Sequence, residues 1–450
     1  MTTRRSTLDS TGSGHAGGGA GSALSAGPGL GDIPPASRDA VARALAVLED
    51  GVLSRDAAEA TPRDMLRGLL AAGIGVARLP VSHGGWGLSL PAHIRLLIEV
   101  ARVEPAAVQA LRSHYAFLER TLRADPSTRP DRWIAEAAAG RMFAGATTEP
   151  PGQVAGALGT TVRRDDDAGR TWRLDGAKAY CTGALYADWL TVLAAADGRP
   201  GERCSVMVRT DQAGVRLADD WAAFGQRASA SGGAVFENVR VDAAEVRPVE
   251  RASGLPQPLN DALLQLTHLA TLTGILVRVH DDAVQQARTS SRHFSHAAAA
   301  TPAQDPVVQQ LIGLLGARVA TATVLSESAA AVLEDAFETP DETRIAAAHR
   351  QVTRAQVIIP DLVLDSASRA FDIGGGSLVG ASRRWDRHWR NARTLASHNP
   401  AVQKARVLGA EALLDEPLPG IWYAGEPGRA PSAGDVGPAP SAGERREGAR

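Results

Sequence analysis

The sequence predicts an α+β protein with a helical N-terminal domain, a central small antiparallel β-sheet or barrel, and a C-terminal four-helix bundle. Three observations predict this order. Apolar residues recur every three or four positions before about residue 140, they alternate with polar residues from 141 to 250, and the helical period returns at Asn260. Because the strand-like runs do not alternate with helices, a parallel doubly wound sheet is not expected.

The predicted N-terminal helical domain covers residues 36–140. Helical patterns begin at Val41 and resume after Thr61-Pro62, a pair typical of a helix start. A glycine-rich loop interrupts them, and two further helical runs follow over 91–103 and 106–124. The second run carries His114 next to Tyr115, a pairing that by itself favours a structural role over a catalytic one.

The predicted β domain covers residues 141–250 and the predicted bundle 251–415. Short alternating runs separated by turn residues indicate strands over 171–174, 179–182, 189–193, 205–209 and 234–241. In the bundle, Asp305-Pro306 has the residues of a helix N-cap and first position, and Pro360 predicts a kink inside a later helix. The last helix is expected over 401–414. The alanine-rich helices and their wide apolar faces indicate close packing and burial against other subunits.

Composition excludes several classes of protein. The 450-residue chain is 44% hydrophobic with a formal net charge of -2, which gives it no general attraction for nucleic acid or an anionic membrane. No run of eighteen apolar residues indicates a transmembrane helix, and the N-terminus lacks the apolar core of a secretory signal. Only Cys181 and Cys204 occur, which fits a reducing cytoplasm.

Both ends of the chain, 1–35 and 416–450, are rich in glycine, proline or small residues and are expected to be disordered, the second one mostly. Within the first, Gly12, Gly14 and Gly17 match a dinucleotide-binding fingerprint. No strand precedes this match and no helix follows it, so no nicotinamide site is expected there. Nor is a metal site expected, because His293 and His296 have no further ligand within several residues.

Four motifs, in this order and at this spacing, carry a family resemblance. They are Thr147-Thr148-Glu149-Pro150, Tyr180-Cys181-Thr182-Gly183, the run from Gly225 to Ser231, and Gly374-Gly375-Gly376. Together they resemble the acyl-CoA dehydrogenase fold across about residues 40–412. The resemblance implies a flavin enzyme with a helix–sheet–helix architecture.

The segment after the glycine triplet departs from the dehydrogenase pattern. It reads Arg387-His388-Trp389-Arg390-Asn391-Ala392-Arg393-Thr394 and then His398-Asn399-Pro400, with no carboxylate between Asp386 and Glu411. It therefore resembles the flavin-dependent monooxygenase branch typified by dibenzothiophene monooxygenases. Those enzymes often carry a histidine pair here, and this chain has Leu395 at the first position. A neutral histidine is suited to proton transfer at oxygen or at an oxidisable substrate.

The resemblance implies roles for nine residues, two of them catalytic. His398 is the expected acid/base and His114 its candidate partner across the pocket. Arg292, and after it Arg288, are candidates for the flavin phosphate, although a cation at a helix end is an equally ordinary reading. Flavin ring contacts are expected from Thr148, Tyr180, Thr182, Trp221 and Ser229, with core packing the alternative for Trp221. His388 is expected to be structural.

With no nicotinamide fold, the chain is expected to receive reduced flavin from a separate NAD(P)H-dependent flavin reductase. Reduced FMN is the expected cofactor and FAD the alternative. The expected reaction is oxygenation of a small sulfur-, nitrogen- or aromatic-containing molecule by a cytoplasmic homo-oligomer, a dimer or tetramer. Two alternatives remain: an acyl-CoA dehydrogenase with FAD and a displaced base, and an inactive relative with a binding or assembly role.

Overall fold

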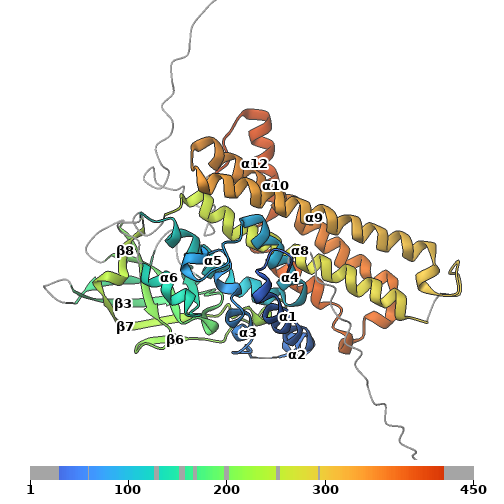
Figure 1. Cartoon of the computed structure of the whole chain (residues 1–450), viewed down its shortest axis with the longest axis horizontal. Coiled ribbons are helices and arrows are strands. Elements are labelled where there is room, and N and C mark those ends of the chain that lie inside the picture. Colours follow the sequence, from blue (N-terminus) through green and yellow to red (C-terminus); the bar gives the residue numbers. More distant parts are fainter. Residues whose placement is uncertain are drawn as a thin grey trace, which may run out of the picture.

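A computed structural model describes residues 30–58, 60–125, 131–151, 158–165, 170–196, 202–249, 254–291 and 294–419. Most of the two predicted tails, including the glycine fingerprint, therefore lies outside the described residues. The predicted phosphate ligand Arg292 also lies outside them. The predicted order of helices, central sheet and helices is confirmed (Figure 1).

The N-terminal part is helical, and side chains cap the N-termini of its two central helices, α4 and α5. Ser89 accepts a hydrogen bond from the amide of Ala92, and Glu104 accepts one from Ala106; each cap is followed by a proline in the first helical turn. The helices are α1 (Pro35–Asp50), α2 (Val52–Ala57), α3 (Arg67–Ala71), α4 (Leu90–Val103), α5 (Pro105–Leu122) and α6 (Asp131–Ala138).

The central sheet is mainly antiparallel and has the strand order β6-β7-β3-β2-β4-β5-β8, with β1 also beside β4. The sheet is not the purely antiparallel one that the sequence predicts, because β1 and β2 each pair in parallel with β4. The strand expected over 179–182 is instead a turn, because β3 ends at Lys178. The strands are β1 (Phe143–Ala146), β2 (Thr161–Arg164), β3 (Thr171–Lys178), β4 (Trp189–Ala196), β5 (Arg203–Arg209), β6 (Val215–Leu217), β7 (Ala234–Asp242) and β8 (Val246–Pro248).

Long helices form the C-terminal part, and α8, α9 and α10 lie side by side (Figure 1). The predicted start of α9 is confirmed, since the Asp305 carboxylate accepts a hydrogen bond of 2.8 Å from the amide of Val307. Helix α10 continues through Pro360. The helices are α8 (Gln257–Thr289), α9 (Pro306–Glu338), α10 (Glu342–Arg369), α11 (Arg387–Ala396) and α12 (Ala401–Leu414).

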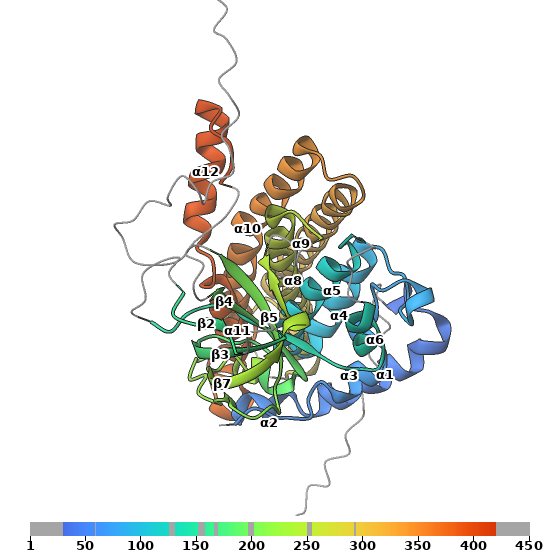
Figure 2. The same ribbon diagram turned by 90° about the vertical axis from the view of Figure 1, so that its left-hand side faces the viewer.

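Helix α8 is the centre of the molecule. It packs against α4 and α5 from the N-terminal part and against α9 and α10 from the bundle (Figure 2). Both α8 and α9 are long and apolar enough to pass a length-and-composition test for a membrane span, but the most apolar stretch of α8 is 78% buried inside the protein. That of α9 is 11% buried, so one chain leaves much of the apolar surface of α9 uncovered.

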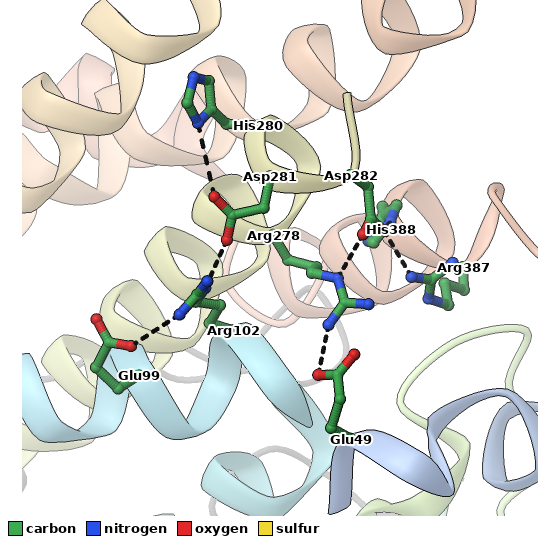
Figure 3. Close-up of polar contacts among 9 residues, drawn as sticks. All are labelled: Glu49, Glu99, Arg102, Arg278, His280, Asp281, Asp282, Arg387 and His388. Atoms are coloured by element: carbon green, nitrogen blue, oxygen red, sulfur yellow. Dashed lines mark hydrogen bonds and ion pairs between the residues drawn. The ribbon is translucent and has the colours of Figure 1, made fainter. Parts of the chain in front are cut away.

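A buried carboxylate on α8 ties three parts of the chain together. Asp282 accepts hydrogen bonds from Arg278 Nε at 2.7 Å, Arg387 at 2.8 Å and His388 Nε2 at 2.8 Å, and Arg278 reaches on to Glu49 of α1 at 2.6 Å (Figure 3). Burial raises the pKa of Asp282, but the hydrogen bond from His388 and the neighbouring charges outweigh burial and hold it well below its usual range. This carboxylate therefore fixes the start of α11 on α8, and His388 has the structural position expected of it.

An Asp282→Asn substitution should lower the free energy of unfolding by about 3–5 kcal/mol, because it leaves the arginines that Asp282 pairs buried without their counter-charge. The measurement is chemical denaturation followed by circular dichroism. Asp211→Asn is the matched control, since Asp211 forms an exposed pair with Arg209 and should contribute little. Equal stability of the two variants would contradict a central role for Asp282.

Candidate active site

Two turns of the β domain have a backbone conformation that side-chain-bearing residues rarely adopt. Tyr180 has φ 55°, and Gln226 and Ala230 both have φ 53°. Among the described residues that are not glycine, these are three of the six with positive φ. Strained backbone of this kind concentrates at functional sites, where surrounding contacts hold it in place.

Gly183 places the first of these turns directly against α5. Its φ is 82°, and an added Cβ would lie 2.4 Å from the carbonyl oxygen of Ala110. Any larger residue would therefore push the turn away from the helix. Its amide also bonds to the carbonyl oxygen of Ser229 at 3.0 Å, which joins the two turns.

Three hydroxyl groups meet where these turns join. Ser231 Oγ lies 2.9 Å from Thr182 Oγ1 and 2.8 Å from Ser229 Oγ, and all three side chains are buried. A chain of three hydroxyls can shift its donors and acceptors to suit a polar ring edge without moving the backbone. The structure thus brings the predicted residues Thr182 and Ser229 together, and adds Ser231 between them.

Aromatic side chains form an open surface on the same turns. Tyr180 is 56% exposed and meets Trp221 edge to face, with ring centroids 6.1 Å apart. The indole nitrogen of Trp221 donates to the carbonyl oxygen of Gln226 at 3.0 Å. Trp221 is only partly buried, so it belongs to this surface and not to the sheet core. Because the two rings are perpendicular, one of them can present its apolar face to a planar ligand while the other supports it from the side.

Thr148 lies beside the first turn, where its carbonyl oxygen accepts a hydrogen bond of 2.9 Å from the amide of Ala179. The next residue, Glu149, forms an ion pair of 2.5 Å with Lys178, whose side chain is fully buried. This pair fixes the Thr-Thr-Glu-Pro segment against the end of β3. The sequence motif alone does not reveal that its carboxylate has a structural role.

Helix α11 is attached to the second turn and carries the chain on to His398. The amide of Gln226 donates to Asn391 Oδ1 at 2.7 Å, and an added Cβ at Gly225 would lie 2.2 Å from the carbonyl oxygen of Arg390. His398 follows in the turn directly after α11, two residues past its last residue, Ala396. The site therefore lies between the β-domain turns, α5, α8 and the end of α11.

His398 faces a second histidine. Its ring meets His268 of α8 edge to face, with the ring centroids 4.6 Å apart. His268 is buried and its Nε2 has no hydrogen-bond partner among the described residues, whereas His398 is exposed to solvent. Although its side chain reaches solvent, the protein packed around the ring disfavours the imidazolium form. This desolvation, followed by the charge on Arg112, lowers the pKa of His398 below its usual range, so the ring is neutral at pH 7.

His114 does not belong to this pair, and the expectation that it partners His398 is not supported. His114 Nε2 donates to the carbonyl oxygen of Gly75 at 2.9 Å, and Nδ1 accepts from the amide of Phe143 at 3.2 Å. With both ring nitrogens bound to backbone groups, His114 connects α5 to β1. The sequence does not single out His268, because a lone histidine within the apolar run of α8 has the pattern of a core residue.

Arg288, the second candidate for a flavin phosphate, is exposed in the last turn of α8. It follows His268 by twenty residues of continuous helix, a separation of about 30 Å. Within one chain Arg288 therefore does not reach the site around His268. Among the described residues no group of three His, Cys, Asp or Glu side chains is arranged to hold a metal ion.

Comparison with known proteins identifies the family. The acyl-CoA dehydrogenase middle domain matches residues 144–239, and the acyl-CoA dehydrogenase C-terminal domain matches residues 266–403, together just over half of the chain. The protein belongs to the acyl-CoA dehydrogenase family, as its architecture indicates.

Similar proteins within this family include flavin monooxygenases. A probable FMNH2-dependent monooxygenase, SfnC of Pseudomonas putida, is 29% identical over 87% of this chain and 98% of its own length. A dibenzothiophene monooxygenase of Rhodococcus erythropolis is 26% identical over 85% of this chain and 94% of its own.

Solved structures share the fold. That of TdsC from Paenibacillus sp. A11-2 with FMN and indole has a TM-score of 0.78 at 23% identity, covering 85% of this chain and 98% of TdsC. That of the methanesulfinate monooxygenase MsuC from Pseudomonas fluorescens has a TM-score of 0.76 at 24% identity, covering 86% of this chain and 99% of MsuC.

The residues at the site fit a flavin. The hydroxyls of Thr182, Ser229 and Ser231 match the alternating donors and acceptors of a flavin edge, and Tyr180 with Trp221 provides an apolar wall for its face. Four of these side chains come from the two strained turns, and Trp221 is tied to the second turn by its hydrogen bond to Gln226.

Replacing Ser231 by Ala should weaken binding of reduced FMN about tenfold, or about 1.4 kcal/mol, because the central hydroxyl of the three is lost. Anaerobic fluorescence titration measures this affinity. The control is Ser368→Ala, since Ser368 is exposed on α10 and its hydroxyl bonds within its own helix to Leu364. Unchanged affinity in the Ser231 variant would remove the hydroxyl group from the flavin site.

Proposed function

We propose that this protein is the oxygenase component of a two-component flavin monooxygenase that uses reduced FMN and O2 to oxygenate a small molecule. The observation that carries the proposal is the accessible, neutral His398 beside His268, at a site framed by the hydroxyl and aromatic groups of two strained turns. The similarity to FMN-dependent monooxygenases over nearly the whole chain supports it.

Each part of the site has a separate task. Thr182, Ser229 and Ser231 bind and orient the flavin edge, and Tyr180 with Trp221 covers its face. When bound, reduced FMN supplies the two electrons with which one oxygen atom of O2 enters the substrate and the other leaves as water. His398, neutral at pH 7, can accept a proton at one ring nitrogen and donate a hydrogen bond from the other where that oxygen is transferred, and His268 holds its ring in place.

The same residues disfavour acyl-CoA dehydrogenation. Removal of a proton beside a thioester requires a base such as a carboxylate, and the chain has none between Asp386 and Glu411. A test of this alternative is anaerobic mixing of the FAD-loaded protein with acyl-CoA thioesters. Bleaching of the flavin absorbance would favour a dehydrogenase over an oxygenase.

The proposed partner is a separate NAD(P)H-dependent flavin reductase, because the described residues form no nicotinamide-binding fold. Its product, free reduced flavin, is FMN in this proposal, with FAD the less favoured choice. The proposed location is the cytoplasm, with which the two buried cysteines agree, since they form no disulfide.

A His398→Ala variant should retain flavin affinity but lose oxygenation by at least about a hundredfold, with O2 released as hydrogen peroxide, since general acid–base groups contribute on this scale. Product formation and peroxide release are measured together in the presence of a reductase. His296→Ala is the control, because His296 is exposed in the loop between α8 and α9. Full oxygenation by the His398 variant would exclude it from the mechanism.

We also propose that the protein is a homo-oligomer, a dimer or tetramer, and that a second copy covers α9. Val307, Leu314 and Val324 are all exposed along this apolar helix. An exposed apolar face of this length is characteristic of a subunit interface. The position of Arg288, about 30 Å of helix from His268, agrees with its serving a site on another copy.

A Val324→Glu substitution should shift the protein to a smaller species, because it places a charge in the middle of the exposed face of α9. Light scattering coupled to size-exclusion chromatography measures the mass. Val47→Glu, on the exposed side of α1, is the control. A wild-type protein that is already monomeric would overturn the proposed interface.

A further inference from the structure

The two packed helices beside the histidine pair, α5 and α8, carry buried polar atoms without hydrogen-bond partners among the described residues. They are Gln109 Oε1 and Arg112 Nε on α5, and Asn260 Oδ1 and His268 Nε2 on α8. Buried polar groups in proteins are almost always hydrogen-bonded, so four unpaired atoms on two packed helices require an explanation. A polar ligand between α5 and α8 would provide the missing partners.

Arg112 is the charged member of this group. Gln109 lies one turn before it on the same face of α5. No hydrogen bond or ion pair to the Arg112 guanidinium is present within the described ranges, although its charge lowers the pKa of both His268 and His398. Arg112 therefore lies close to the histidine pair while its own donors are unused.

The balance of charge around Arg112 is positive. Burial lowers its pKa to about 10, and the charge of Asp261 offsets this only in part. The same Asp261 is the carboxylate that acts on buried Arg120. Burial also raises the pKa of Asp261 to about 6. A single, weakly acidic carboxylate thus faces two buried arginines, Arg112 and Arg120.

Such an arrangement is unfavourable without an added negative charge, because burying a cation that lacks a counter-charge costs several kcal/mol. A bound oxyanion would supply that charge and would accept hydrogen bonds from the planar guanidinium in the geometry that arginine favours. The flavin ligands Thr182, Ser229 and Ser231 come from β-domain turns, whereas these unpaired groups come from α5 and α8. The oxyanion is therefore assigned to the substrate.

We propose that the substrate carries an oxyanion group, a carboxylate, sulfinate or sulfonate, that binds to Arg112 between α5 and α8. The inference rests on the proposed oxygenase function and names its substrate class. Gln109, Asn260 and His268 complete the polar lining, and Arg112 holds the anion so that the oxidisable atom of the substrate faces His398. Arg112 is in this sense a specificity-determining residue that touches substrate.

The test compares two sulfides that differ only in charge, 4-(methylthio)benzoate and thioanisole. Binding of each to the full chain loaded with reduced FMN is measured anaerobically by calorimetry, and sulfoxide formation is then measured with O2. The wild-type protein should bind the benzoate at least tenfold more tightly than thioanisole. Arg112→Gln should weaken binding of the benzoate at least tenfold and raise its KM by a similar factor, while the values for thioanisole stay unchanged. Arg112→Lys should retain much of the preference for the benzoate.

Arg209→Gln is the matched control, since Arg209 is exposed and paired with Asp211, and it should preserve the preference. Two results would overturn the inference: a wild-type protein that binds both sulfides equally, or an Arg112→Gln variant whose affinity for reduced FMN falls tenfold, which would assign the cation to the flavin. If the benzoate binds through Arg112 but neither sulfide is oxygenated, the anion site stands and the proposed function fails.

Discussion

The ion-pair and hydrogen-bond cluster around Asp282 is the interaction on which the geometry of the site depends (Figure 3). Asp282 holds Arg387 and His388, the first two residues of α11, and Arg278 extends the contact to α1. Helix α11 then carries Asn391 to the second β-domain turn and His398 to His268. Because charges buried in this way tolerate little displacement, the cluster sets the position of a histidine more than two turns of helix away.

The protein uses burial in two opposite ways. Around Asp282 each buried charge has a partner, and burial therefore contributes rigidity. Arg112, in contrast, is buried without a hydrogen-bond or ion-pair partner among the described residues, so its positive charge is not compensated locally. Both clusters contain arginine, aspartate and histidine on α8 and a neighbouring helix. They differ in whether the desolvation cost of the buried charge is offset by a partner within the protein, as it is at Asp282, or is left for a ligand to offset, as at Arg112.

The site also separates neutral from charged groups. His398 stays neutral because the protein around it and the Arg112 charge disfavour the imidazolium form. The hydroxyls of Thr182, Ser229 and Ser231 are neutral as well, so the positive charge is confined to the side formed by α5 and α8. A substrate with one charged end and one oxidisable end would be oriented by this division alone.

The sequence by itself determined the architecture and the family, and it predicted His398 as a catalytic residue. Apolar period and turn residues specify helices, sheet and bundle, and the start of α9 at Asp305-Pro306 is a local hydrogen bond that needs no tertiary contact. It also predicted Thr182 and Ser229 as flavin contacts, because both lie in contiguous motifs. The structure brings their hydroxyls together through Ser231, and their contact with the flavin stays a prediction.

Only the tertiary structure decided which histidine faces His398 and which cation lacks a partner. His114 and His268 have similar sequence surroundings, since each lies within an apolar helix. They differ in the hydrogen-bond partners that packed segments supply to their ring nitrogens: Gly75 for His114, and none for His268 Nε2 among the described residues. The sequence does not single out Arg112 either. Whether its guanidinium has a counter-charge depends on residues more than a hundred positions away, such as Asp261. Hydrogen bonding and charge pairing at a site are properties of packed neighbours, and sequence spacing within one helix does not encode them.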